Sequence, residues 1–142
     1  MKQLLKTLLL IFIISFPAHL CTAQESLYKK LNAEMKTHFE NGRHSEAIET
    51  AKKAVEVAEN TFGKEHPYVA ASLNNLGMMY VAKHNYEKAE PLFERSLRIM
   101  EKVRGENDPI LKPMLESLIK CSAEMRNIDK ELEYRDRLRD LR

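Results

Sequence analysis

The stretch LNNLGMMY at residues 73–80, followed by NYEKAEPLFERSL at residues 85–97, decides the fold of this chain. In the first segment leucine, leucine, glycine and tyrosine recur at steps of three, one and three residues, which places them on one face of an α-helix. In the second segment apolar residues recur at steps of three and four. Between them lies a short polar turn, and Asn85 is a suitable N-cap for the second helix. The sequence therefore predicts a helix-turn-helix unit.

This unit repeats along the chain with a period of 42 residues. The spacing separates Pro67 from Pro109 and Gly63 from Gly105, and each glycine is placed to end the second helix of a unit. The same register relates Ala47 to Ala89, Leu31 to Leu73, Leu73 to Leu115 and Asn32 to Asn74. No alternating strand pattern is present. We therefore predict an all-α domain over residues 24–142, with about three units at roughly 26–67, 68–109 and 110–142.

Small residues explain how the two helices of a unit pair. Gly77 and Ala89 fall on facing surfaces, where the absence of bulk lets the helix axes approach to ~8–10 Å. A single helix pair cannot bury its apolar face alone, so neighbouring units share one continuous core. Terminal units are expected to be atypical because each covers an exposed end of that core.

The first residues have the pattern of a secretory signal peptide. Lys2 and Lys6 precede an apolar run at 8–16, and Cys21-Thr22-Ala23 precedes a suitable cleavage point. We predict a signal peptide at residues 1–23 and an exported protein, periplasmic or secreted. The alternatives are a buried N-terminal helix and an uncleaved anchor, although a bilayer span needs ~20 apolar residues.

The cysteines offer little chemistry. Cys21 could be a lipidation site, but bulky Leu20 precedes it where lipoprotein signals carry a small residue. Cleavage after Ala23 would leave Cys121 alone, which excludes an internal disulfide and is typical of a small core residue. A membrane is therefore expected as a partner only if the signal segment is retained or lipidated.

The charge balance argues against nucleic acid. The whole chain has 23 basic and 21 acidic residues, and the predicted signal peptide carries two of the basic ones and none of the acidic ones. The remainder is formally neutral, whereas nucleic-acid binders usually show a basic excess. The histidines show no metal-binding spacing, and no phosphate loop or nucleophile motif is present. We expect no enzyme activity, no catalytic residues, no metal and no cofactor.

The segment at 73–97, the 42-residue period and the Gly-x-x-x-Pro joints resemble tetratricopeptide repeats, in particular those of kinesin light chains. The resemblance covers residues 26–142 and implies a right-handed α-solenoid. It is weaker in the first unit, where Glu34 and His38 replace apolar and tyrosine positions. It is also weaker in the third, where Ser122, Glu131 and Arg135 replace the residues equivalent to Tyr80, Ala89 and Phe93.

The resemblance implies that the chain binds another protein or a peptide in a groove lined by the first helix of each unit. Asparagines of the LNNL segment face that groove in the family and hydrogen-bond the peptide backbone. This points to Asn74 and Asn75, with Asn32 as their counterpart in the first unit. Helical register adds Lys36 and Met78, although one methionine of the Met78-Met79 pair is expected in the core. The alternative is that these asparagines only cap local turns or face water.

Two functions follow from these observations. The first is an exported adaptor or scaffold that binds a partner through the groove. The second is a structural or accessory subunit that self-associates or docks in an envelope assembly, and the chain would then be a homo-oligomer or part of a larger complex.

Overall fold

The computed structural model of the protein describes residues 22–141. Most of the predicted signal peptide, residues 1–21, lies outside the described residues, so its cleavage stays a prediction. Between residues 22 and 141 no helix is both long enough and apolar enough to cross a membrane.

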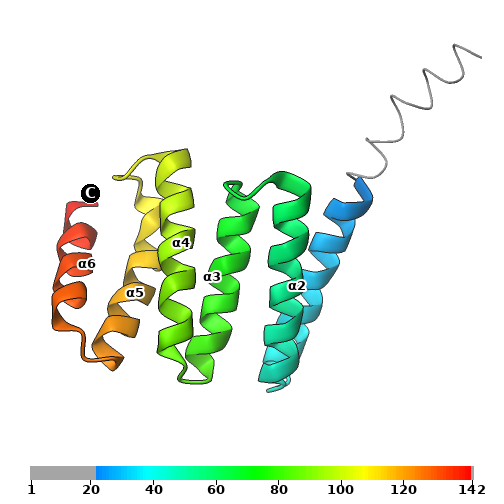
Figure 1. Cartoon of the computed structure of the whole chain (residues 1–142), viewed down its shortest axis with the longest axis horizontal. Helices are drawn as coiled ribbons and strands as arrows, with labels where there is room; N and C mark the ends of the chain where they lie inside the picture. The colour runs from blue at the N-terminus through cyan, green and yellow to red at the C-terminus, as the bar shows by residue number, and fades with distance from the viewer. Residues whose placement is uncertain (1–21, 142) are drawn as a thin grey trace, which may run out of the picture.

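The described chain consists of six stacked helices and a short 3₁₀ turn, without a strand (Figure 1). The first helix, which we call the N-terminal helix, covers residues 22–40. It is followed by α2 (His44–Phe62), α3 (Pro67–Ala82), α4 (Tyr86–Arg104), η1 (Pro109–Leu111), α5 (Lys112–Glu124) and α6 (Ile128–Asp140). Consecutive helices pair into three helix-turn-helix units that lie side by side, with α6 at the far end (Figure 1). The predicted all-α fold is confirmed.

The helix ends repeat with the sequence. Asn85 caps α4 by accepting a hydrogen bond from the backbone N–H of Lys88 at 3.2 Å, as predicted. Asn127, 42 residues later, caps α6 in the same way through Lys130 N–H at 3.3 Å. Gly105 ends α4 with φ of 93°, in a conformation that residues with a Cβ rarely adopt. Capping residues that recur every 42 positions therefore set the helix boundaries of successive units.

Close packing inside the second unit depends on Gly77. A Cβ at this position would lie 2.7 Å from Cε1 of Phe93, a side chain that is completely buried. Ala89 is also completely buried, in agreement with the predicted close approach of α3 and α4. Arg135, the counterpart of Phe93 in unit three, is exposed.

The structure shows that unit one reverses the sizes at this contact, whereas unit three does not. Met35 and Ile119 occupy the positions equivalent to Gly77, and Ala51 and Arg135 occupy those equivalent to Phe93. Met35 is buried and Ile119 packs partly buried against the main core. In unit one the large residue is therefore on the first helix and the small one on the second, whereas in unit three Arg135 is exposed and Ile119 is the apolar residue of the pair.

Ion pairs between second helices also follow the repeat. Arg95 of α4 lies 2.6 Å from Glu59 of α2, and Arg137 of α6 pairs with Glu101 of α4. Both partners of the second pair are 42 residues beyond those of the first. Each unit is thus tied to the one before it at the same place.

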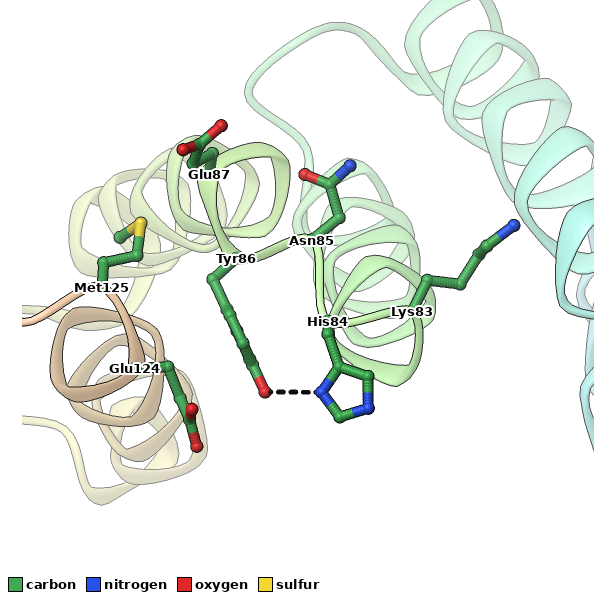
Figure 2. A pocket seen from close by; sticks show the side chains of 7 residues that line it. All are labelled: Lys83, His84, Asn85, Tyr86, Glu87, Glu124 and Met125. Carbon is green, nitrogen blue, oxygen red and sulfur yellow. Dashed lines mark hydrogen bonds between the residues drawn. The ribbon is translucent and has the colours of Figure 1, made fainter.

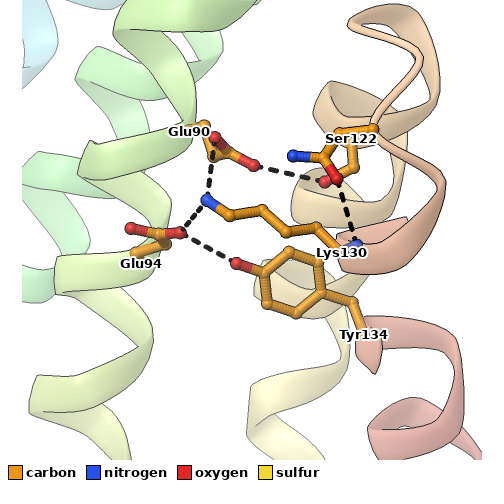
Figure 3. A network of polar contacts seen from close by, with 6 residues as sticks. Glu90, Glu94, Ser122, Lys130 and Tyr134 are labelled. Carbon is orange, nitrogen blue, oxygen red and sulfur yellow. Dashed lines mark hydrogen bonds and ion pairs between the residues drawn. The ribbon is translucent and has the colours of Figure 1, made fainter. Parts of the chain in front are cut away.

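The last helix packs against α5, and polar contacts also tie it to α4 (Figure 3). Lys130 lies 3.1 Å from Glu90 and 2.8 Å from Glu94, and the Tyr134 hydroxyl donates to Glu94 at 2.9 Å. Ser122 of α5 donates to Glu90 at 3.2 Å. Tyr134 is the buried residue of α6, and Leu141 just beyond the helix is also buried. The charged end of the chain covers one end of the core, as expected of a terminal unit.

Candidate functional site

The predicted site residues fall on the N-terminal helix and α3, two of the three first helices. We define the first-helix face as three exposed residues at equivalent positions of the N-terminal helix, α3 and α5, together with the three asparagines beside them. These residues are Lys36, Met78 and Lys120, with Asn32, Asn74 and Asn75. The face carries amide groups and an apolar side chain between two cations, and it holds no nucleophile.

Asn75 and Asn32 lie together. The Asn75 amide donates to the side-chain oxygen of Asn32 at 3.4 Å, and Asn32 donates to the backbone oxygen of Tyr28 at 2.9 Å. The first of these bonds is long for an N–H···O contact and is therefore weak. Both asparagines are half-buried. The pair spans the N-terminal helix and α3, and the free donor and acceptor capacity of the two amides suits a peptide backbone.

Asn74 lies apart from this pair. Its amide donates to the Met78 sulfur at 3.8 Å, and its oxygen is buried without a hydrogen-bond partner among the described residues. Asn32 and Asn74 match in the 42-residue register, yet the side chain that reaches Asn32 is that of Asn75. The repeat pattern alone does not reveal this offset, because it does not give the rotation of one first helix against the next.

Met78 and Lys36 are accessible. Met78 is 49% exposed, whereas its neighbour Met79 is buried at 5%, so one methionine belongs to the core as expected. Lys36 is exposed and lies 3.7 Å from Glu40, a surface pair of little energetic weight. Lys120 of α5 is exposed at the equivalent position. An apolar ligand group at Met78 would therefore have a cation on each neighbouring unit.

A separate hollow of about 500 Å³ lies between the turn after α3 and the end of α5 (Figure 2). Its lining residues are Lys83, His84, Asn85, Tyr86, Glu87, Glu124 and Met125. The Tyr86 hydroxyl and Nδ1 of His84 share a hydrogen bond of 3.1 Å. Partial burial raises the pKa of Tyr86, and the Glu124 carboxylate acts in the same direction. The phenol thus stays protonated, and the hollow contains a surface hydrogen bond and no activated group.

The remaining reactive side chains are structural. Burial raises the pKa of Cys121 to about 11, with a further contribution from Glu90, so the thiol is not a nucleophile near neutral pH. Cys121 is completely buried, as predicted for a core residue. In the part of the chain from residue 22 to 141, no three His, Cys, Asp or Glu side chains are grouped so that they could hold a metal ion.

Tyr28 is a structural residue that no sequence pattern predicts. This side chain is buried, lies 5.2 Å from the Tyr68 ring between centroids, and donates to the Tyr68 backbone oxygen at 3.2 Å. It therefore joins the N-terminal helix to the start of α3, beside the asparagine pair. Its counterparts 42 and 84 residues later are Ala70 and Lys112, so no repeat signal marks it.

Comparison with known proteins agrees with this geometry. The tetratricopeptide repeat family matches residues 36–102. No curated protein matches the chain. The crystal structure of BtubC (BKLC) from P. vanneervenii superimposes with a TM-score of 0.77 at 19% identity, covering 84% of this chain and 47% of that one.

Two further solved structures show the same architecture. A Podosopora anserina structure described as kinesin light chain TPR-like repeats has a TM-score of 0.69 at 20% identity, covering 85% of this chain and 56% of that one. The TPR domain of Arabidopsis FLU has a TM-score of 0.70 at 18% identity, covering 80% of this chain and 92% of that one. This chain thus spans about half the length of the first two structures. At these identities the likeness establishes the fold.

Tetratricopeptide domains are typically non-catalytic and generally mediate contacts between proteins. The 42-residue helix-turn-helix period, the family match and the structural neighbours lead to one assignment: the chain is a tetratricopeptide repeat protein whose structural neighbours are kinesin-light-chain-like.

Proposed function

We propose that this protein is an adaptor that binds a segment of another protein on the first-helix face. The observation that carries the proposal is the exposure of Met78 between Lys36 and Lys120 at equivalent positions of three neighbouring units. Methionine is flexible and polarisable and adapts to apolar ligand groups. Lysines on both sides favour acidic residues next to the apolar one, by electrostatic complementarity.

The asparagine pair supplies the second contact. The bond between Asn75 and Asn32 is long, so a peptide can replace it at little cost. An amide that releases its partner offers one donor and one acceptor, the same set that a peptide backbone presents. We infer that Asn75 and Asn32 exchange their mutual bond for bonds to the ligand.

The location and the overall curvature belong to the same proposal. The signal-like pattern at residues 1–23 supports export, so we place the adaptor in the periplasm or outside the cell. The kinesin-light-chain-like neighbours support a right-handed solenoid whose concave side is the first-helix face. Three units make a short groove, which favours weak or partner-assisted binding.

A second candidate, self-association through α6, rests on two exposed apolar residues. Ile128 is 67% exposed and Leu132 is 55% exposed, one helical turn apart. The same side of α6 carries Arg135 and Arg139, at positions where α4 has the buried residues Phe93 and Leu97. These arginines make the end of the stack polar, which favours binding on the first-helix face.

Affinity capture from the native host with two matched variants separates the candidates. Met78→Glu places a charge on the first-helix face, and Val103→Glu places the same charge at a residue of α4 with equal exposure, 48% against 49%. We expect wild type and Val103→Glu to capture the same proteins and Met78→Glu to lose them. Equal capture by all three proteins would instead favour self-association. In that case the molar mass of the protein in solution should rise with its concentration, and the Leu132→Lys variant should have a lower mass than wild type.

A further inference from the structure

An apolar heptad pattern runs from η1 and α5 through the following turn into α6. Its residues alternate at steps of three and four positions, the spacing that places them on one side of a continuous helix. They are Leu111, Met114, Leu118, Cys121, Met125, Ile128 and Leu132. The pattern therefore crosses the turn at residues 125–127, where α5 has ended and α6 has not yet begun.

The other two units lack this continuation. In unit two the counterparts of Met125 and Leu132 are Lys83 and Glu90, and both are charged. In unit one the counterpart of Met125 is Asn41. A polar or charged side chain at the turn thus interrupts the apolar stripe in both units. The uninterrupted stripe is a property of the third unit and does not follow from the repeat.

The structure divides this stripe between the core and the surface. Leu111, Leu118 and Cys121 are completely buried, whereas Ile128 is 67% exposed and Leu132 is 55% exposed. The turn sends α6 back alongside α5, as Figure 1 shows at the end of the stack, and this leaves the last part of the stripe in water. A helix that continued straight from α5 would keep all of these residues on one side.

The turn between α5 and α6 is strained at Arg126. This residue has φ of 57°, a left-handed conformation that is unfavourable for a residue with a Cβ. It stands where helix ends of this kind prefer glycine: the Arg126 N–H donates to the Ala123 oxygen at 3.0 Å. The next N–H, that of Asn127, donates to the Ser122 oxygen at 2.8 Å. Unit one has Gly42 at the position of Arg126, so only the third unit gains by straightening this turn relative to the first.

The last helix is also the one that can leave its unit most readily. Tyr134 is the one buried residue of α6, whereas α4 has six. Polar contacts, among them the ion pair of Arg137 with Glu101, tie α6 to α4. Elements that bury few apolar side chains open most easily. The place that α6 vacates is complementary to α6 itself, so the occupant that fits it is the α6 of a second copy.

We propose that two copies of this chain associate by exchanging α6. In each copy α5, the turn and α6 form one helix, and α6 docks on α4 and α5 of the other copy through the contacts that it makes in the closed chain. Met125, Ile128 and Leu132 of the two long helices then pack against one another where the helices cross. Association of closed copies through Ile128 and Leu132 is a different arrangement, because α6 would stay in its own chain.

The balance between the two forms depends on the turn and on concentration. Exchange keeps the docking contacts of α6, relieves the strain at Arg126 and buries Ile128 and Leu132. It gives up the cap of α6, in which the Asn127 side chain accepts from the Lys130 N–H at 3.3 Å, and the independent motion of two copies. The exchanged dimer retains the N-terminal helix, α3 and α5, and so carries two first-helix faces. The exchange does not rest on the proposed function, which would stand if the protein were monomeric.

Charge reversal across one ion pair tests the exchange directly. In a closed copy Arg137→Glu brings two carboxylates together, and Glu101→Arg brings two guanidinium groups together. In an exchanged dimer that contains one copy of each variant, both docking sites again join opposite charges. We expect the two variants, unfolded in urea and refolded together, to form more dimer in sedimentation equilibrium than either variant alone. Equal amounts of dimer in the mixture and in the separate variants would overturn the exchange, because closed copies keep the mismatch within each chain.

The turn supplies a second test. We expect Arg126→Gly to raise the dissociation constant of the dimer about a hundredfold, about tenfold for each copy, because glycine adopts the left-handed turn without strain and has a low helix propensity. The matched control is His84→Gly, at the equivalent turn of unit two with φ of 56°, which should leave the constant unchanged. Asn127→Ala should lower the constant, because only the closed turn uses this cap. Equal effects of Arg126→Gly and His84→Gly, or a wild type and an Asn127→Ala variant that both stay monomeric up to their solubility, would overturn the proposal.

Discussion

Alanine at position 77 tests the packing that defines the central unit. Its Cβ would lie 2.7 Å from Cε1 and 2.8 Å from Cζ of Phe93, closer than real Cβ contacts come. Phe93 is completely buried, so its ring cannot turn into solvent to make room. Overpacking of this kind lowers the free energy of unfolding by about 1–3 kcal/mol, and the better helix propensity of alanine raises it by about 1 kcal/mol. We expect Gly77→Ala to lower the free energy of unfolding by about 1 kcal/mol.

A double-mutant cycle with Phe93→Leu separates the clash from helix propensity. The propensity gain at position 77 is the same whether residue 93 is phenylalanine or leucine, so it cancels in the cycle. Leucine withdraws the ring atoms that meet the new Cβ. The double variant should therefore be about 1–2 kcal/mol more stable than predicted by adding the changes in unfolding free energy of the two single variants.

The assay is urea unfolding followed by far-ultraviolet circular dichroism. A control cycle pairs Phe93→Leu with Met78→Ala, a change at the exposed residue next to Gly77, and should be additive within about 0.5 kcal/mol. If the Gly77→Ala cycle is equally additive, the ring does not limit the space at position 77 and the reasoning is refuted.

Three further predictions concern the core and the C-terminal cap. Ser96→Ala removes a buried hydroxyl that donates to the Ala70 backbone oxygen at 2.7 Å, and should lower the free energy of unfolding in urea by about 1 kcal/mol; a gain in stability would show that this hydrogen bond does not stabilise the fold. Burial would raise the pKa of Glu94, but its hydrogen bonds with Lys130 and Tyr134 outweigh it and hold the pKa below 4.5. The stability that this carboxylate contributes is thus present above pH 4.5 and is lost as the pH falls through its lowered pKa. Glu94→Gln should therefore be less stable than wild type at neutral pH, and the difference in unfolding free energy should vanish in acid. A difference that does not change with pH would contradict this. In a Cys21→Ser chain, Cys121 should react with a thiol reagent only as fast as the third unit opens, so that urea accelerates labelling strongly; labelling at the rate of a free thiol in the folded protein would show that the third unit is not packed.

Much of the fold follows from the sequence because one period fixes many features at once. The 42-residue register places the glycine stops and the asparagine caps, and hence the helix boundaries. It cannot show that Met35 takes the place of the ring in unit one, because the large and the small residue have changed helices and Met35 differs from the glycine of unit two. Compensation of this kind is visible only when both sides of the contact are seen together.

The candidate site was predicted less completely, for a related reason. The 42-residue register places Asn32, Lys36 and Met78 on the first helices. It does not predict how α3 is rotated, and this rotation brings Asn75 to Asn32. Tyr28 has no counterpart in the other units, so no pattern marks it. The contacts of Lys130 and Tyr134 with Glu94 join residues 36 and 40 positions apart, and no repeat signal marks them because Lys52 stands 42 residues before Glu94. Features that depart from the repeat could therefore be identified only from the structure.

The central claim is that a partner binds on the first-helix face, and site-specific photo-crosslinking in the native host tests it most directly. A photoreactive residue is placed at position 78 or, as a control with equal exposure on a second helix, at position 103. We predict that a crosslinked partner forms from position 78 and not from position 103. Crosslinks from position 103 alone, or equally from both, would contradict the assignment of binding to the first-helix face.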